Sequence, residues 1–327
     1  MRLVYAADLH GDIDSYRSLF DLAVATDAQA AIVGGDLLPH AITLRSALQT
    51  QRDFIAQQLV PLLELFRAQH PEIDVYLLPG NDDWAAAIME LDRLEQAGLV
   101  FLLHERVYAL TPQPPLPSRR ERGSRAVREQ GSEGVSGHHP VTPSPRHPVT
   151  PDGGLWLAGY ACVPLTPFSI KDYERRDIEP LPPFSFDMAY ISWSGEIQPA
   201  SAEALAAQPS IAEALATLAQ RSDPQHTIYV CHTPPFNTPL DAMPRGRHVG
   251  STALREFIEQ HAPPLTLHGH IHESPEISGR YAVQLGATWS INPGHDPGRF
   301  QAVTLDTDDL AETIAHTAYG RPAASSK

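Results

Sequence analysis

The chain has 327 residues, of which 42% are hydrophobic and 19% are charged, and its formal net charge at pH 7 is −15. This composition is ordinary for a folded protein, and the length suffices for one large or two small domains. The acidic excess argues against nucleic acid as a partner, because no broad basic face is available to bind phosphates. No apolar run approaches the roughly 18 residues of a membrane-spanning helix, and the apolar residues at the N-terminus are too few for a signal peptide, so we expect a cytoplasmic protein without a membrane partner.

The first hundred residues repeat one pattern three times: a short apolar run, a polar loop and a helical stretch. The apolar runs cover residues 2–7, 30–33 and 75–78, and the helical stretches cover residues 16–25, 44–68 and 84–97, with Ser15 as the expected N-cap of the first helix. Alternating strands and helices are typical of an α/β domain with parallel strands. Ligands of such sheets bind beyond the carboxyl ends of the strands, so the functional site is expected in the polar loops.

Residues 112–153 interrupt this pattern with a segment that is rich in proline and arginine and holds hardly any aliphatic residue. Such a segment cannot bury a core, so we predict a disordered insertion, with a basic arm or a His-rich metal tract as the weaker alternative. Around it we predict one domain formed by residues 1–111 and 154–316, followed by a flexible tail at residues 317–327. Residues 163–199 hold many prolines and aromatic residues and are assigned only as a loop-rich cap or rim.

Beyond the insertion, strands are predicted at residues 155–160, 227–231, 265–267, 281–285, 289–292 and 301–305, and helices at residues 211–219 and 252–261. The run at residues 265–267 stops abruptly, and three histidines follow within five residues, at His268, His270 and His272. An extended backbone would place His270 and His272 on one side together. Neutral imidazole is the commonest protein ligand for first-row divalent ions, so this segment predicts a metal site. A polar loop after a strand is the alternative for an isolated His-x-His.

Seven oxygen or nitrogen donors stand at the ends of predicted strands. They are Asp8, His10, Asp36, Asn81, His232, His270 and His272. One ion needs fewer donors, whereas two ions that share a bridging carboxylate would use them all. Mixed imidazole, carboxylate and amide donors suit Mn, Fe, Zn or Ni better than Ca or Mg, and we favour Mn.

The charge of such a site points to an anionic substrate. Two divalent ions, two aspartates and a bridging hydroxide together leave a formal charge of about +1. Two ions roughly 3.5–4 Å apart can lower the pKa of a bridging water and stabilise the oxygens of an in-line displacement at phosphorus. The donor set therefore predicts a site that attracts an anion such as a phosphate.

Five motifs, in order along the chain, resemble those of the calcineurin-like metallophosphoesterases. They are Asp8-x-His10, Gly35-Asp36, Gly80-Asn81, His232 after a strand, and Gly269-His270-x-His272. The resemblance implies a four-layer α/β/β/α sandwich with two mixed β-sheets flanked by helices. It also implies that Asp8, His10 and His272 hold one metal ion, that Asn81, His232 and His270 hold the other, and that Asp36 bridges them, with a metal-bridging hydroxide as the nucleophile.

One position departs from the family pattern. Many members carry a histidine directly after the asparagine, where it is thought to assist the leaving group, and this chain has Asp82 followed by Asp83. Members without that histidine resemble phosphodiesterases more than monoesterases, so we favour phosphodiesters and leave the general acid unassigned. An exposed Asp82 beside two cations should be ionised. A phosphomonoesterase acting on a phosphoprotein or nucleotide, a nuclease, and a non-catalytic binding scaffold on the same fold are the alternatives.

Several polar residues near the motif loops are weaker candidates for the site. Substrate contacts are considered for His40, His248, His295, Arg245 and Arg247, against the simpler interpretation of surface or packed residues. Asp12 and Asp83 are considered as partners that orient the ligating imidazoles.

Overall fold

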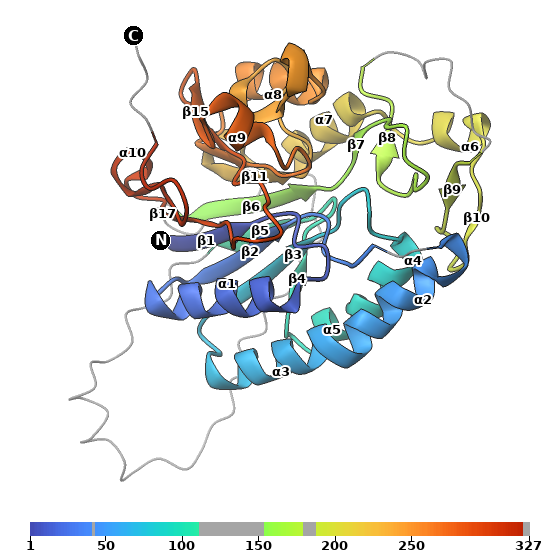
Figure 1. Ribbon diagram of the computed structural model, residues 1–327. Coiled ribbons are helices and arrows are strands. Elements are labelled where there is room, and N and C mark those ends of the chain that lie inside the picture. Colours follow the sequence, from blue (N-terminus) through green and yellow to red (C-terminus); the bar gives the residue numbers. More distant parts are fainter. Residues whose placement is uncertain (41–42, 111–153, 179–187, 323–327) are drawn as a thin grey trace.

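A computed structural model of the chain describes residues 1–40, 43–110, 154–178 and 188–322 (Figure 1). The predicted insertion at residues 112–153 and the last part of the predicted tail, residues 323–327, lie outside the described residues. None of the described helices is long and apolar enough to cross a membrane.

The first six-stranded sheet is built mainly from the N-terminal part of the chain. Its order is β18-β17-β1-β2-β3-β4, with parallel pairing from β1 to β4 and antiparallel pairing at the β17 and β18 edge. The bounds are β1 Arg2–Ala6, β2 Ala30–Gly34, β3 Asp74–Leu78, β4 Phe101–Leu102, β17 Val303–Asp306 and β18 Ala315–His316. Almost every residue of the three central parallel strands is buried, as expected of strands covered on both faces.

The second six-stranded sheet has the order β15-β16-β14-β11-β6-β5. Strands β6, β11, β14 and β16 run parallel, and β5 and β15 pair antiparallel at the two edges. The bounds are β5 Val107–Leu110, β6 Leu155–Tyr160, β11 Thr227–Cys231, β14 Leu265–Leu267, β15 Ala282–Leu285 and β16 Thr288–Ile291. Both sheets are therefore mixed, as the family resemblance implied.

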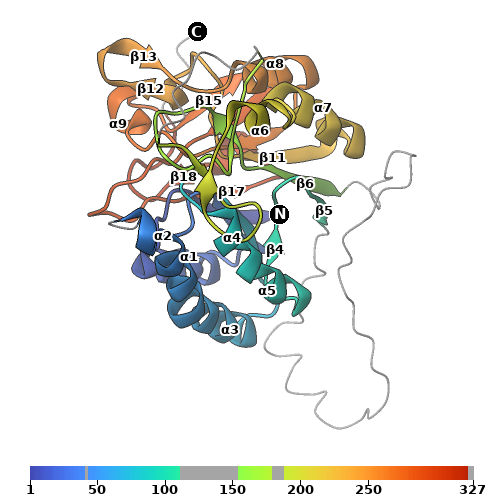
Figure 2. The same ribbon diagram turned by 90° about the vertical axis from the view of Figure 1, so that its right-hand side faces the viewer.

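Helices lie on both sides of the paired sheets in two perpendicular views (Figures 1 and 2). One side carries α1 Ile13–Ala25, α2 Leu44–Phe54, α3 Val60–Gln69, α4 Ala85–Ile88 and α5 Asp92–Gln96. The other side carries α7 Ile211–Arg221, α8 Thr252–His261 and α9 Ser274–Ser278. Two short helices, α6 Ala202–Ala206 and α10 Leu310–Thr313, complete the described helices.

The structure corrects the predicted start of α1 and the predicted helices at residues 44–68 and 84–97. Asp12, and not Ser15, caps α1, because its carboxylate accepts the Asp14 N–H at 3.2 Å while the Ser15 hydroxyl donates to the same carboxylate at 2.6 Å. The long stretch predicted at residues 44–68 contains a π-helical turn, Ile55–Leu59, which joins α2 to α3. Single π-helical turns inside α-helices are rare and frequently occur near functional sites.

The described parts of residues 163–199 lie against the loop that follows Asn81. They form two short strand pairs, β7 Val163–Pro164 with β8 Glu174–Arg175, and β9 Tyr190–Ile191 with β10 Gln198–Pro199. The Asp172 carboxylate accepts the Ala85 N–H at 2.9 Å, and the Ser192 hydroxyl accepts the Ala86 N–H at 2.9 Å. These contacts place the region at the start of α4, where a cap or rim for the motif loops would lie.

Contacts continue into the beginning of the predicted tail. Thr317 donates its backbone N–H to Ala302 at 2.9 Å, and the Tyr281 hydroxyl donates to the Gly320 carbonyl at 2.6 Å. The predicted tail boundary at residue 317 therefore falls among residues that make tertiary contacts.

Candidate metal centre

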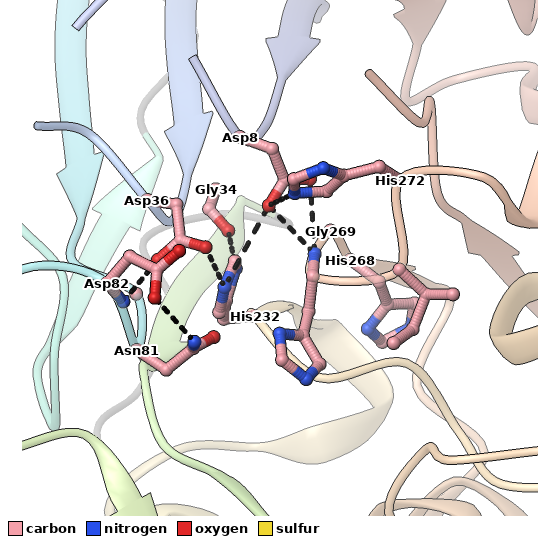
Figure 3. A network of polar contacts seen from close by, with 12 residues as sticks. Asp8, Gly34, Asp36, Asn81, Asp82, His232, His268, Gly269 and His272 are labelled. Carbon is pink, nitrogen blue, oxygen red and sulfur yellow. Dashed lines mark hydrogen bonds and ion pairs between the residues drawn. The ribbon is translucent and has the colours of Figure 1, made fainter. Parts of the chain in front are cut away.

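Figure 3 shows five of the seven predicted ligands close together where parallel strands of both sheets end, namely Asp8, Asp36, Asn81, His232 and His272. The donor atoms of His10 and His270 belong to the same cluster by their separations. The first sheet supplies Asp8 and His10 after β1, Asp36 after β2 and Asn81 after β3, whereas the second sheet supplies His232 after β11 and His270 and His272 after β14. Carboxyl ends of parallel strands are the usual position of ligand sites in α/β sheets. The cluster thus lies between the two sheets and draws on each of them.

The nitrogen and carboxylate donors form two groups that share one residue. Asp8, His10, Asp36 and His272 make the first group, and Asp36, His232 and His270 make the second, with the donor atoms of each group within 4.8 Å of one another. The His272 Nε2 lies 3.4 Å from Asp8 Oδ1, and the His232 Nε2 lies 3.3 Å from Asp36 Oδ2. Asp36 therefore belongs to both groups.

Several donor atoms in the cluster are buried without a hydrogen-bond partner. Three of the six such side-chain atoms in the described part of the chain are His10 Nδ1, Asn81 Oδ1 and His232 Nε2. The Nε2 atoms of His10 and His272 also face each other at 3.1 Å. Buried polar atoms in folded proteins are nearly always hydrogen-bonded, so Asn81 Oδ1 and His232 Nε2 fit a bound cation. His10 Nδ1 instead lies on the other side of its ring, 4.0 Å from Asp82 Oδ2.

Backbone contacts fix the orientation of the donors. The His232 Nδ1 donates to the Gly34 carbonyl at 2.9 Å. When the ring is neutral, Nε2 therefore carries the lone pair that can bind a cation. The Asp8 carboxylate accepts the His270 N–H at 2.9 Å, and Asp36 Oδ1 accepts the Asp82 N–H at 2.8 Å. Each carboxylate therefore keeps a fixed direction toward the cluster.

Strained backbone is concentrated at the same residues. Four of the nine non-glycine residues with positive φ in the described chain belong to the cluster, namely Asp8, His10, Asp36 and His270, with φ of 58°, 43°, 51° and 65°. A side chain at Gly80 would also place its Cβ only 2.2 Å from Asp36 Oδ1. Strain of this kind persists where the surrounding structure enforces it, and it often marks a functional site.

At four residues of the cluster, the attraction between opposite charges shifts the pKa more than burial does. Burial raises the pKa of Asp8, but the charge of His272 lowers it to about 2, and in the same way His232 holds the pKa of Asp36 far below its usual range. Burial lowers the pKa of His232 and His272, but Asp36 and Asp8 respectively raise it to about 9. A cation that binds here must displace protons from these two imidazoles.

No protein-family model matches the sequence, and no curated protein matches it. Solved structures do match. A dimetal phosphatase from Danio rerio aligns with a TM-score of 0.50 at 12% identity, covering 98% of this chain and 96% of that one. The protein TT1561 of Thermus thermophilus aligns with a TM-score of 0.49 at 17% identity, covering 96% and 97% of the two chains.

The chain shares the fold of the Danio rerio dimetal phosphatase. The similarity extends over nearly the whole length of both chains, including the two mixed sheets whose strand ends carry the cluster. The Asp/His cluster at these strand ends is therefore a candidate site for divalent metal ions.

Asp82 is partly buried in this fold, with a side chain 20% exposed, and is not the exposed carboxylate that the sequence suggested. Burial, followed by the charges of Asp36 and Asp83, raises the pKa of Asp82 to about 8. Ionisation of Asp82 at neutral pH would therefore depend on nearby cations, which favour the charged form.

The weaker histidine candidates separate clearly. The His40 ring stacks on His10 with centroids 4.4 Å apart, and the His295 ring approaches the rings of His10 and His272 at 5.8 and 5.5 Å. His248 instead lies 2.7 Å from the Asp241 carboxylate, within a short strand pair of the second half of the chain. Two of the three histidines thus border the Asp/His cluster.

The two aspartates that were considered as partners of the imidazoles accept hydrogen bonds from backbone N–H groups instead. Asp12 caps α1, as described above. The fully buried Asp83 carboxylate accepts the N–H groups of Leu37, Leu38 and Gly80 at 3.0, 2.8 and 2.8 Å. Asp83 therefore ties the loop after β2 to the loop after β3, and the predicted role beside an imidazole is wrong.

Three buried polar residues around the cluster lie outside the five motifs. Gln51 donates to the Asp82 carbonyl at 2.8 Å and accepts the Trp84 N–H at 2.8 Å, and Asn292 donates to the carbonyls of Gly269 and Ile271 at 3.2 and 3.1 Å. His268 hydrogen-bonds to the Cys231 carbonyl at 2.9 Å and to the Thr266 hydroxyl at 2.8 Å. His268 directly follows an apolar run, whereas Gln51 lies among polar residues and offers no such sequence signal.

Proposed function

We propose that the chain is a dinuclear metal-dependent phosphoesterase. The observation that carries this proposal is a pair of donor groups that share Asp36 and contain buried atoms without partners. One ion would be held by Asp8, His10 and His272 and the other by Asn81, His232 and His270, with Asp36 between them. Mn is our first choice for reconstitution, and Fe, Zn or Ni would also suit the donors. The helices on both sides of the sheets support the proposal of a four-layer sandwich.

When bound, two divalent ions would lower the pKa of a water and stabilise negative charge on the phosphoryl oxygens. The side chains of the protein would position the ions, and one side of the cluster is open to solvent. The Asp8 and His232 side chains are fully buried at the floor of the cluster, whereas those of His272 and Asp82 are 34% and 20% exposed. A small phosphoester would therefore approach from the side of His272 and Asp82.

A phosphodiester is the substrate class that we propose. The support is Asp82, which stands where the family resemblance implies a histidine that assists the leaving group. We predict that metal-loaded protein cleaves bis(4-nitrophenyl) phosphate faster than 4-nitrophenyl phosphate, two esters with the same leaving group. Asp82→His should raise monoester turnover relative to diester turnover, because a positioned general acid contributes about 10²- to 10⁴-fold.

Asp92→His is the matched control for that experiment, since Asp92 is an exposed aspartate of α5. The control should leave the ratio of the two activities unchanged. Faster turnover of the monoester by the unmodified protein would identify a phosphomonoesterase. Absence of turnover on both esters at full metal content would leave the binding scaffold as the better account.

A further inference from the structure

His40 and Asp82 face each other at the mouth of the cluster. The His40 Nε2 lies 3.5 Å from Asp82 Oδ2, and the His40 ring stacks on the His10 ring at an angle of 22°. Exposure of the side chains rises from 2% at Asp36 to 20% at Asp82 and 62% at His40. The pair therefore lies between the buried donors and solvent.

A buried amide links the two segments that carry this pair. The Gln51 side chain donates to the Asp82 carbonyl at 2.8 Å and to the carbonyl of Pro39, the residue before His40, at 3.4 Å. Its oxygen accepts the Trp84 N–H at 2.8 Å, and Gln51 is only 2% exposed. Because one residue of α2 contacts both segments, the separation of His40 and Asp82 is set by the fold.

The pair offers complementary hydrogen-bonding groups. A neutral imidazole carries one N–H donor, and an ionised carboxylate only accepts. At 3.5 Å the two atoms are too far apart for a strong bond to each other. An ester oxygen beside them could accept from His40 at about 2.8 Å, and only the alcohol formed after hydrolysis could also donate to Asp82.

We propose that His40 and Asp82 form the subsite for the leaving-group oxygen of the phosphoester, with His40 as the hydrogen-bond donor. The inference rests on the proposed phosphoesterase function. Hydrolysis forms a P–O bond to water and breaks the P–O bond to the leaving group, and the departing oxygen takes its proton from water. His40 stabilises the negative charge that develops on that oxygen, so it matters most for leaving groups that bear this charge poorly.

The test compares methyl phosphodiesters whose second ester group is 4-nitrophenyl, phenyl or benzyl, hydrolysed by Mn-loaded protein. His40→Ala should lower kcat roughly 10- to 100-fold for the benzyl ester, as expected for a lost hydrogen bond to a charged group, and under about 3-fold for the 4-nitrophenyl ester. His40→Asn, which keeps an N–H donor, should recover part of the loss. Metal content and Tm should stay as in the unmodified protein.

His226→Ala is the matched control. His226 is also an exposed histidine beside an aspartate, with its Nδ1 2.8 Å from Asp223 Oδ2, and it precedes β11. The control should change none of the three rates.

Two results would overturn the assignment of His40. They are an equal loss on all three esters and an unchanged rate on the benzyl ester. Absence of turnover by the unmodified protein at full metal content would contradict the proposed function and this inference together. That outcome differs from the other two because the unmodified protein and the variant are then equally inactive.

Discussion

Protons and metal ions compete for two histidines of the cluster. The aspartates beside His232 and His272 raise the pKa of both imidazoles to about 9 against burial, compared with about 6.5 in an unfolded chain. A raised folded-state pKa contributes stability that is complete below pH about 6.5 and is lost as the pH rises through about 9. We therefore predict that the Tm of chelator-treated protein falls as the pH rises from about 6.5 to about 9, while its apparent affinity for Mn increases.

Metal-loaded protein serves as the control for this prediction. Its imidazoles are already neutral ligands, so the same rise in pH should lower its Tm much less. Scanning calorimetry across the pH range measures both forms. A Tm of chelator-treated protein that is flat between pH about 6.5 and 9 would show that the two imidazoles are not held protonated by Asp8 and Asp36.

Helix α2 contributes to the site through one buried side chain. Gln51→Ala would leave the Asp82 carbonyl and the Trp84 N–H without their partner, so we predict a loss of about 2–4 kcal/mol in the free energy of unfolding. The variant should also show the leaving-group selectivity of His40→Ala, because it frees the segment before His40. Urea denaturation and the three-ester series measure these two effects.

Gln49→Ala is the control in the same helix. Gln49 is exposed and bonds only the Asp53 carboxylate among the hydrogen bonds of its described side chain, so its loss should change stability by no more than about 0.5 kcal/mol. Equal effects of the two substitutions would mean that the buried amide does not hold the motif loops.

Strands were easier to predict than the contacts between loops. Buried parallel strands read as uninterrupted apolar runs, which is why β2 and β11 were placed almost to the residue. The helix predicted at residues 84–97 instead breaks into α4, a 3₁₀ turn and α5. Its first N–H groups bond to Gln51 and Asp172, which are distant in the chain, and no local pattern reports such contacts.

The ends of the predicted insertion meet in the second sheet. Strands β5 and β6 pair antiparallel with Leu110 opposite Leu155, so a short linker can join them. We predict that replacing residues 112–151 with a short Gly/Ser linker leaves Tm and Mn binding nearly unchanged, because the removed composition cannot bury a core. A sharp fall in Tm or a loss of metal from the shortened chain would assign this segment a role in the fold.

Assembly of the candidate site depends on the meeting of two sheets. Motif order predicted which residues would gather, because each follows a strand and strand ends share one edge. Their separation, the strained φ values and the position of His40 over His10 come from packing between segments far apart in the chain. Those features required the structure.

The most direct test of the central claim measures bound metal and phosphodiester turnover in the same samples. Unmodified protein, Asp36→Asn and the exposed-site control Asp53→Asn are stripped with chelator, reloaded with Mn and assayed on bis(4-nitrophenyl) phosphate. We predict that the unmodified protein and the control bind two Mn ions per chain and turn over the diester. We predict that Asp36→Asn binds fewer than two ions per chain and loses turnover. Two ions retained by an active Asp36→Asn variant, or a fully loaded unmodified protein without turnover, would contradict the account.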